Sequence, residues 1–196
     1  FRAGGWVDRD RFRGHQLAGK ILGILGLGRL GKIVARYALA MGMKVVASDP
    51  NISEPDMAKL GVAKVSMESL FRESDVLSLH VLLTDATKNL VKEEQLRLMK
   101  PTAYFINTAR AEVVAQGALE KALEEHWIAG AAVDVMWGEE GGLKFEQELK
   151  NNRLWEYAKS HENLIIAPHI GGAAYEAMHA TEDFIAELVA RHFKSA

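Results

Sequence analysis

Short apolar runs alternate with amphipathic segments along almost the whole chain, and this alternation restricts the fold more than any other feature of the sequence. The apolar runs have the length of buried strands, and the segments between them carry apolar residues at helical spacing. Strands that are apolar throughout are typical of a parallel sheet covered by helices on both faces. The sequence therefore predicts an α/β fold, a doubly wound parallel sheet in one domain over residues 1–196.

The expected elements follow one another without a repeat or a flexible linker. Strands are expected at residues 20–27, 44–47, 62–65, 76–81, 103–108, 129–135 and 164–167. Helices are expected at residues 29–41, 67–73, 93–99 and 117–126, with a long last helix from about residue 174. Two segments lie outside this series, an N-terminal arm at residues 1–19 and a long polar insertion at residues 138–160 with a helical pattern of its own. A connection as long as this insertion is usually functional or part of an interface.

Composition excludes several classes of site and partner. The chain has no cysteine, which excludes disulfides, thiolate metal sites and a cysteine nucleophile and fits a reducing cytoplasm. A formal net charge of −2 gives no general attraction to nucleic acid or to an anionic membrane. No apolar run approaches the ~18 residues that a membrane span requires. We therefore expect a cytoplasmic protein without a metal site and without a nucleic-acid or membrane partner.

The sequence GLGRLG at residues 26–31 leaves the first expected strand and opens the first expected helix. A Gly-x-Gly-x-x-Gly pattern is weak alone, but between a strand and a helix it is typical of a dinucleotide-binding turn. The first glycine permits the tight turn, the second lets the backbone approach a pyrophosphate, and the third lets helix and strand pack closely. The free N–H groups at the start of the helix attract the phosphates.

Asp49 ends the second expected strand, 18 residues after Gly31. A carboxylate at this place can bond the ribose hydroxyls of NAD and repel the additional phosphate of NADP. Taken alone, Asp49-Pro50 would indicate no more than a turn. Together with the glycine-rich turn it predicts NAD as the cofactor.

Polar residues follow four later strands at the point where each strand ends. His80, Arg110, Asp134 and His169 occupy these places, and open α/β sheets bind ligands at this edge. A single histidine near a core is more often a hydrogen-bonded structural residue, and a single arginine is often a surface residue. Their convergence at one edge favours a functional site.

Six sequence blocks together resemble the cofactor domain of the D-2-hydroxyacid dehydrogenases, particularly the D-3-phosphoglycerate dehydrogenase type. They are GLGRLG at 26–31, SLHV at 78–81, MKP at 99–101, NTAR at 107–110, GAAVDV at 130–135 and PHIGG at 168–172. In that family the cofactor domain is inserted into a smaller substrate domain, which the resemblance implies is missing from this chain. The family usually dimerises through this domain, so we expect a homodimer with Trp6, Phe12 and Trp155 as candidate interface anchors.

The resemblance also implies roles for individual residues. Arg110 matches the arginine that holds the substrate carboxylate and polarises the carbonyl, and His169 matches the proton donor. Glu139 matches the carboxylate that pairs with this histidine and favours its protonated form. Asp134 and the Thr108 backbone resemble the groups that anchor the nicotinamide carboxamide. The implied cofactor-binding set is Gly26, Gly28, Arg29, Leu30, Gly31, Asp49, His80, Val81, Thr87, Thr108, Asp134, His169, Gly171 and Gly172.

Three positions depart from the family pattern. Leu82 and Glu140 stand where the family usually has proline, and Ala111 stands where it usually has glycine. If the backbone at Ala111 needs a positive φ, alanine costs on the order of 1 kcal/mol there, or the local turn differs. We prefer Glu139 to Glu140 as the partner of the histidine because its spacing from Arg110 fits the family without a gap.

The implied activity is hydride transfer between nicotinamide and a small D-2-hydroxy acid or its 2-keto partner, with 3-phosphoglycerate among the candidates. One alternative is an NAD-sensing binding protein of the dehydrogenase-like corepressor type, without metabolic turnover. Another is a module that binds NADH and performs no chemistry by itself. Turnover on a panel of 2-keto acids with NADH separates these hypotheses.

Overall fold

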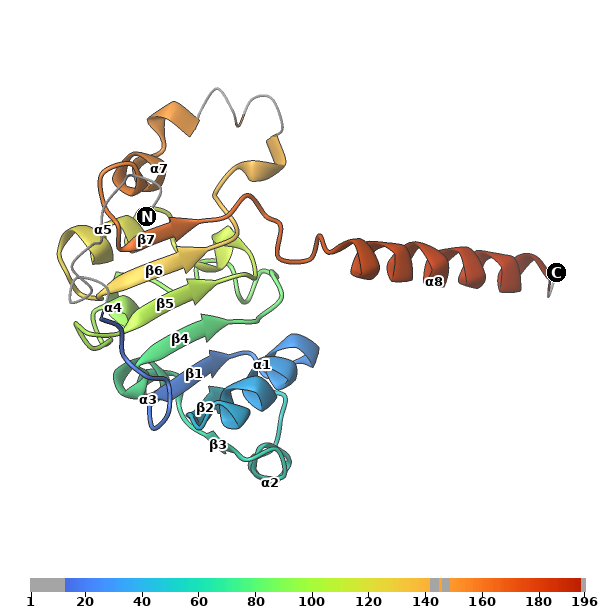
Figure 1. Cartoon of the computed structure of the whole chain (residues 1–196), viewed down its shortest axis with the longest axis horizontal. Coiled ribbons are helices and arrows are strands. Elements are labelled where there is room, and N and C mark those ends of the chain that lie inside the picture. The colour runs from blue at the N-terminus through green and yellow to red at the C-terminus, as the bar shows by residue number, and fades with distance from the viewer. Residues whose placement is uncertain (1–12, 142–144, 146–148, 195–196) are drawn as a thin grey trace, which may run out of the picture.

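The computed structural model describes residues 13–141, 145 and 149–194, and within these ranges seven strands form one parallel sheet (Figure 1). The strand order is β3-β2-β1-β4-β5-β6-β7, and every neighbouring pair is parallel. The strands are β1 (Ile21–Leu25), β2 (Lys44–Ser48), β3 (Val62–Lys64), β4 (Val76–Leu79), β5 (Tyr104–Asn107), β6 (Gly130–Val133) and β7 (Leu164–Ile166). The predicted doubly wound parallel sheet is therefore confirmed.

The helices agree with the expected series except at a few points. They are α1 (Arg29–Ala40), α2 (Glu54–Ala58), α3 (Met67–Glu73), α4 (Glu93–Leu96), α5 (Ala118–Glu124), α7 (Arg153–Ala158) and α8 (Tyr175–Lys194). The sequence did not predict α2, whose five residues are too few to show a period. Ser53 starts this helix because its side chain accepts the Asp56 N–H, and Pro55 lies in the first turn, where its missing N–H costs nothing.

The core consists of two apolar clusters, one on each face of the sheet. On β2, Val45 and Ala47 belong to one cluster and Val46 belongs to the other, because successive side chains of a strand point to opposite faces. Helices α1 and α2 cover the first face, and α3, α4, α5 and α7 contribute to the cluster on the second. Phe71 and Phe105 are completely buried there, and each such side chain contributes about 1.5–3 kcal/mol.

The two faces are not covered equally. On the face that carries α1, no helix of the described residues lies over β4 to β7 (Figure 1). The sequence predicted a sheet covered by helices on both faces, so this part of the sheet differs from the expectation. Tyr104 of β5 is 48% exposed and Ile165 of β7 is 65% exposed as a result. A groove of about 510 Å³ runs over these strands and is also lined by Tyr37 and Met41 of α1.

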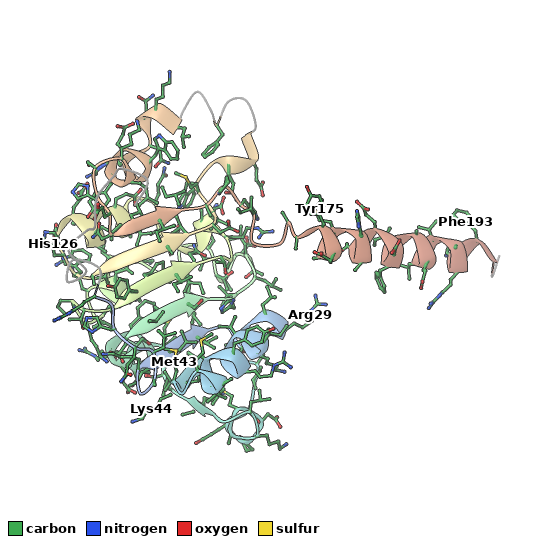
Figure 2. All side chains as sticks on the ribbon, in the orientation of Figure 1. Arg29, Met43, Lys44, His126, Tyr175 and Phe193 are labelled. Atoms are coloured by element: carbon green, nitrogen blue, oxygen red, sulfur yellow. The ribbon has the colours of Figure 1, made fainter. Side chains whose placement is uncertain are left out.

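The last helix, α8, projects away from the body of the molecule (Figures 1 and 2). Its side chains are exposed along its length, Tyr175 and Phe193 near its two ends among them. Across the parts of the chain that the structure covers, no helix is both long enough and apolar enough to cross a membrane.

The two segments outside the expected series are described in part. In the insertion, α7 confirms the helical pattern, and Trp155 lies on it half-buried. Trp6 and Phe12, the other candidate interface anchors, lie outside the described residues.

Candidate functional site

The glycine-rich turn links the end of β1 to the start of α1. Gly26 has φ +90°, which favours glycine, and its N–H donates to the carbonyl of Ser48 on β2 at 3.0 Å. A Cβ on Gly31 would lie 2.3 Å from the carbonyl oxygen of Gly26, so only glycine lets the helix approach the turn this closely. A Cβ on Gly28 would meet nothing within 4 Å. The middle glycine therefore leaves open the side on which a ligand can reach the backbone.

The start of α1 fits an anionic ligand. Gly28 precedes this helix of 12 residues and supplies no side-chain cap, so the first N–H groups keep their hydrogen-bonding capacity. Arg29 is the first residue of the helix and its side chain points out from the body (Figure 2). A phosphate group is the ligand that this arrangement suits.

Asp49 lies directly after β2 and binds the glycine-rich turn. Its Oδ2 accepts the N–H of Leu27 at 2.8 Å, and its Oδ1 accepts the N–H of Asn51 at 2.8 Å. A carboxylate has about four acceptor sites, so two remain for hydroxyl groups of a ribose. The acid and the glycine-rich turn are thus adjacent.

A cleft of about 360 Å³ lies at the carboxyl ends of β4 and β5. It brings together five of the predicted residues, namely Leu30, His80, Val81, Thr108 and Arg110. Thr87 is not among its lining residues. The hydroxyl of Thr87 instead donates to the carbonyl of Leu82, so this side chain holds the loop after β4.

His80 is half-buried and lines this cleft. Burial lowers the pKa of its imidazole because a charged ring loses its water there. Its Nε2 lies 2.9 Å from the hydroxyl of Ser78, a buried residue on the same strand. The ring is therefore neutral at physiological pH and oriented by a hydrogen bond.

Arg110 is presented by a turn that Asn107 holds. The buried Asn107 side chain accepts the N–H of Ala109 at 3.0 Å and donates to the carbonyl of Arg110 at 3.0 Å. The guanidinium itself is exposed and donates to the carbonyl of Ala109 at 2.7 Å. Ala111 then begins a short 3₁₀ turn without a positive φ, so alanine fits where the family usually has glycine.

His169 and Glu139 form an ion-pair geometry, with Nδ1 2.7 Å from Oε1. The other carboxylate oxygen of Glu139, Oε2, accepts the N–H of Met136 at 2.8 Å, which fixes the orientation of the acid. The Nε2 of His169 has no hydrogen-bond partner within the described ranges, and the side chain is 47% exposed. The ring thus has one nitrogen held by a carboxylate, and its other nitrogen is without a partner among the described residues.

The strand order explains why these residues lie along one edge. His80 follows β4, Arg110 follows β5, Asp134 follows β6 and His169 follows β7, and these four strands are consecutive neighbours in a parallel sheet. In the part of the chain that the structure describes, no hydrogen bond or ion pair joins Arg110 to the His169–Glu139 pair.

Sequence reasoning missed two residues of the site. Ser78 and Asn107 were quoted in motifs, but no role was assigned to either. The signal that could have found them is a polar residue at the last or next-to-last position of an otherwise apolar strand. Such a residue is buried, so its polar atoms must bond to the loop that follows.

No metal-binding group of histidine, cysteine or acidic residues occurs in the described part.

Comparison with known proteins shows the family of this chain. The model of the family described as D-isomer specific 2-hydroxyacid dehydrogenase, NAD binding domain, matches residues 1–171. The chain is 40% identical to the glyoxylate reductase of Thermococcus litoralis, over 97% of this chain and 55% of that protein. It is also 40% identical to the D-3-phosphoglycerate dehydrogenase of a Synechocystis species, over 87% of this chain and 28% of that protein.

A solved structure has the same fold. The D-lactate dehydrogenase of Aquifex aeolicus, determined with NAD and lactic acid, aligns with a TM-score of 0.87 and 34% identity over 99% of this chain and 59% of that one. The chain thus spans about half the length of the curated glyoxylate reductases that it matches. With a family match over residues 1–171 and these relatives, the chain belongs to the D-isomer specific 2-hydroxyacid dehydrogenases and corresponds to their NAD-binding domain.

Proposed function

We propose that this chain is the cofactor-binding part of an NAD-dependent oxidoreductase that interconverts a small D-2-hydroxy acid and its 2-keto acid. The observation that carries the proposal is the His169–Glu139 pair, at 2.7 Å, on the same sheet edge as the glycine-rich turn. A histidine with a carboxylate on one nitrogen and an open second nitrogen is suited to proton exchange with a substrate oxygen.

Each residue of the proposed site has a task that follows from its surroundings. Glu139 holds the Nδ1 side of the His169 ring, so that Nε2 can donate a proton to the substrate carbonyl oxygen. Arg110 binds the substrate carboxylate, for which its forked donors are suited. The neutral His80 ring lines the cleft without adding a charge beside Arg110.

The glycine-rich turn, the start of α1 and Asp49 are the residues that would hold NAD. When bound, this cofactor supplies or accepts the hydride. The carboxylate of Asp49 favours NAD over NADP because it repels a 2′-phosphate. We expect this chain alone to bind NADH and to turn over substrate poorly. Catalysis normally needs a cleft that closes around the substrate and excludes water, and the substrate domain that would close it is, by the family resemblance, missing from this chain.

The substrate is proposed at the level of a class. The relatives named above are a glyoxylate reductase, a D-3-phosphoglycerate dehydrogenase and a D-lactate dehydrogenase. Each of these names refers to a small 2-hydroxy or 2-keto acid. One arginine for the carboxylate and one proton donor for the neighbouring oxygen are sufficient to recognise such an acid.

A homodimer through this domain remains part of the proposal, and sedimentation velocity of the chain tests it.

Two measurements test the proposed function. NADH fluorescence titration of this chain should show saturable binding that is tighter than the binding of NADPH. A version of the protein extended to the length of its relatives should oxidise NADH with one of glyoxylate, pyruvate or 3-phosphohydroxypyruvate. Binding of NADH without turnover on any 2-keto acid would favour the corepressor-type alternative. Absence of NADH binding would exclude both the oxidoreductase and the corepressor-type alternative.

The pair of neighbouring glutamates offers a matched control. Glu139→Gln in the extended protein should lower kcat by about 10²-fold, the lower end of what general acid–base catalysis contributes, with little change in NADH affinity. Glu140→Gln removes the same charge from the exposed neighbour and should leave kcat near the wild-type value. Equal effects of the two substitutions would contradict the role assigned to Glu139.

A further inference from the structure

Four polar side chains are buried among the described residues, namely Ser74, Ser78, Asn107 and Asp134. Asp134 is the one that carries an ionisable carboxylate, and the residue is 7% exposed. A buried carboxylate must be compensated by hydrogen bonds because it has lost its water. Where these bonds go indicates what the residue does.

Both oxygens of Asp134 bind the backbone directly after His169. Oδ1 accepts the N–H of Ile170 at 2.9 Å, and Oδ2 accepts the N–H of Gly171 at 2.8 Å. These residues are 36 and 37 positions away along the chain. Hydrogen bonds from N–H groups to an ionised acceptor are about twice as strong as neutral ones. The carboxylate at the end of β6 thus clamps the turn that follows β7.

This turn needs an external clamp because its backbone is unusual. His169 has φ +53°, one of three non-glycine residues with a positive φ within the described ranges. Such a conformation costs of order 1–3 kcal/mol unless its surroundings enforce it. On the preceding side, Ala167 donates its N–H to the carbonyl of Val133 at 2.8 Å. His169 is therefore bracketed by a strand bond before it and the Asp134 bonds after it.

Gly171 is adapted to the clamp. A Cβ at this position would lie 2.7 Å from Oδ2 of Asp134, which is too close for any real side chain. The absence of a side chain is what lets the N–H approach the carboxylate. Gly172, by contrast, has nothing within 4 Å of its would-be Cβ.

We propose that Asp134 is a positioning residue, which fixes the strained turn after β7 so that His169 meets Glu139. This role adds to the contact with the nicotinamide carboxamide that the family resemblance implies. A carboxylate has about four acceptor sites and the turn uses two, so both roles are compatible. The importance of Asp134 for a reaction rests on the proposed function, whereas its effect on the turn does not.

The test is made on the chain without cofactor or substrate. In wild-type protein, NMR should detect the Nδ1–H of His169 bonded to Glu139, and the amides of Ile170 and Gly171 should be protected from hydrogen exchange. Asp134→Ala should weaken or abolish the Nδ1–H signal. It should also speed exchange of the two amides on the order of tenfold, the effect of losing one charged hydrogen bond.

A second variant disturbs the same hydrogen bonds by changing the turn and not the carboxylate. Gly171→Ala keeps the carboxylate but pushes the turn away from it, so it should reproduce the loss of the Nδ1–H signal. Because the two substitutions differ in charge and size, a shared effect cannot come from either property alone.

Asp75 provides the matched control for general destabilisation. Its carboxylate also accepts a backbone N–H, that of Ile21 at 2.8 Å, but at the amino ends of the strands. Asp75→Ala should lower the free energy of unfolding and leave the His169 signal unchanged. The proposal is overturned if Asp134→Ala and Gly171→Ala leave the signal and both amides as in wild type, or if Asp75→Ala alters them equally. Failure of NADH binding, by comparison, contradicts only the proposed function.

Discussion

The two halves of the ligand edge are built in different ways. The half at β1 and β2 consists of one contiguous turn and one acid, and steric limits at glycine positions shape it. The half at β4 to β7 is assembled from four strand ends, and the buried side chains of Ser78, Asn107 and Asp134 hold it. Backbone geometry thus preorganises the first half, whereas hydrogen bonds between distant segments preorganise the second. Substitutions should therefore act by different mechanisms in the two halves.

The largest effect is expected in the glycine-rich turn. Gly31→Ala places a Cβ 2.3 Å from the carbonyl oxygen of Gly26, so helix and turn must separate. Overpacking of this kind costs about 1–3 kcal/mol or more, and urea unfolding measures the loss. Gly28→Ala is the control, because its Cβ meets nothing within 4 Å. It should keep the free energy of unfolding and weaken NADH binding, and equal destabilisation by both would contradict the distinction between these glycines.

Asn107→Ala should have the next largest effect, now in the second half. It removes the partner of the Ala109 N–H and of the Arg110 carbonyl, and water can replace the partner at the exposed Arg110, so the cost falls mainly on the N–H of Ala109 and is about 1–3 kcal/mol at most. In the extended protein, KM for the 2-keto acid should rise more than NADH affinity falls, because the turn that presents Arg110 loosens. A KM equal to that of wild type would show that the amide does not set the position of Arg110.

Asp49→Asn should have a moderate effect on cofactor binding and should also cost one of the two backbone hydrogen bonds of this side chain. The asparagine removes the negative charge while one side-chain oxygen can still accept a backbone N–H. NADH affinity should fall about tenfold, as expected for one charged hydrogen bond, and the preference over NADPH should shrink. Parallel fluorescence titrations with the two cofactors provide the ratio. An unchanged ratio would argue against Asp49 as the selecting residue.

The smallest expected effect is a pH dependence from His80. Burial lowers the pKa of its imidazole below the ordinary value of 6.5, so the unfolded chain binds this proton more readily than the folded one. The stabilisation is complete above pH 6.5 and is lost as the pH falls through the lowered value. His80→Gln should flatten the stability curve below about pH 6.5. A curve of unchanged slope in chemical denaturation would show that His80 does not contribute.

The same difference between the halves determined how much the sequence could predict. The glycine-rich turn and Asp49 lie within 24 residues of one another, and their spacing alone indicated the strand, the turn and the acid. His169 and Glu139 are 30 residues apart and meet because β6 and β7 are neighbours. Their pairing was implied by the resemblance and could not be obtained from periodicity.

Other features depend on tertiary context and were outside the reach of a single sequence. The strand expected at residues 20–27 ends at Leu25, because Gly26 has a positive φ that a strand does not continue. The uncovered face over β5 and β7 could not be predicted, since Tyr104 and Ile165 occur in runs that read as fully buried. The roles of Ser78 and Asn107 became apparent only when their hydrogen-bond partners were known.

The central claim is that both halves of the edge bind one NAD molecule, with its nicotinamide end near the His169–Glu139 pair. Titration of NADH into ¹⁵N-labelled chain, followed by amide chemical shifts, tests it most directly. The account predicts that the amides of residues 26–31 and those of Ile170 and Gly171 shift together, with one dissociation constant. Shifts confined to the glycine-rich turn, or none at all, would contradict it.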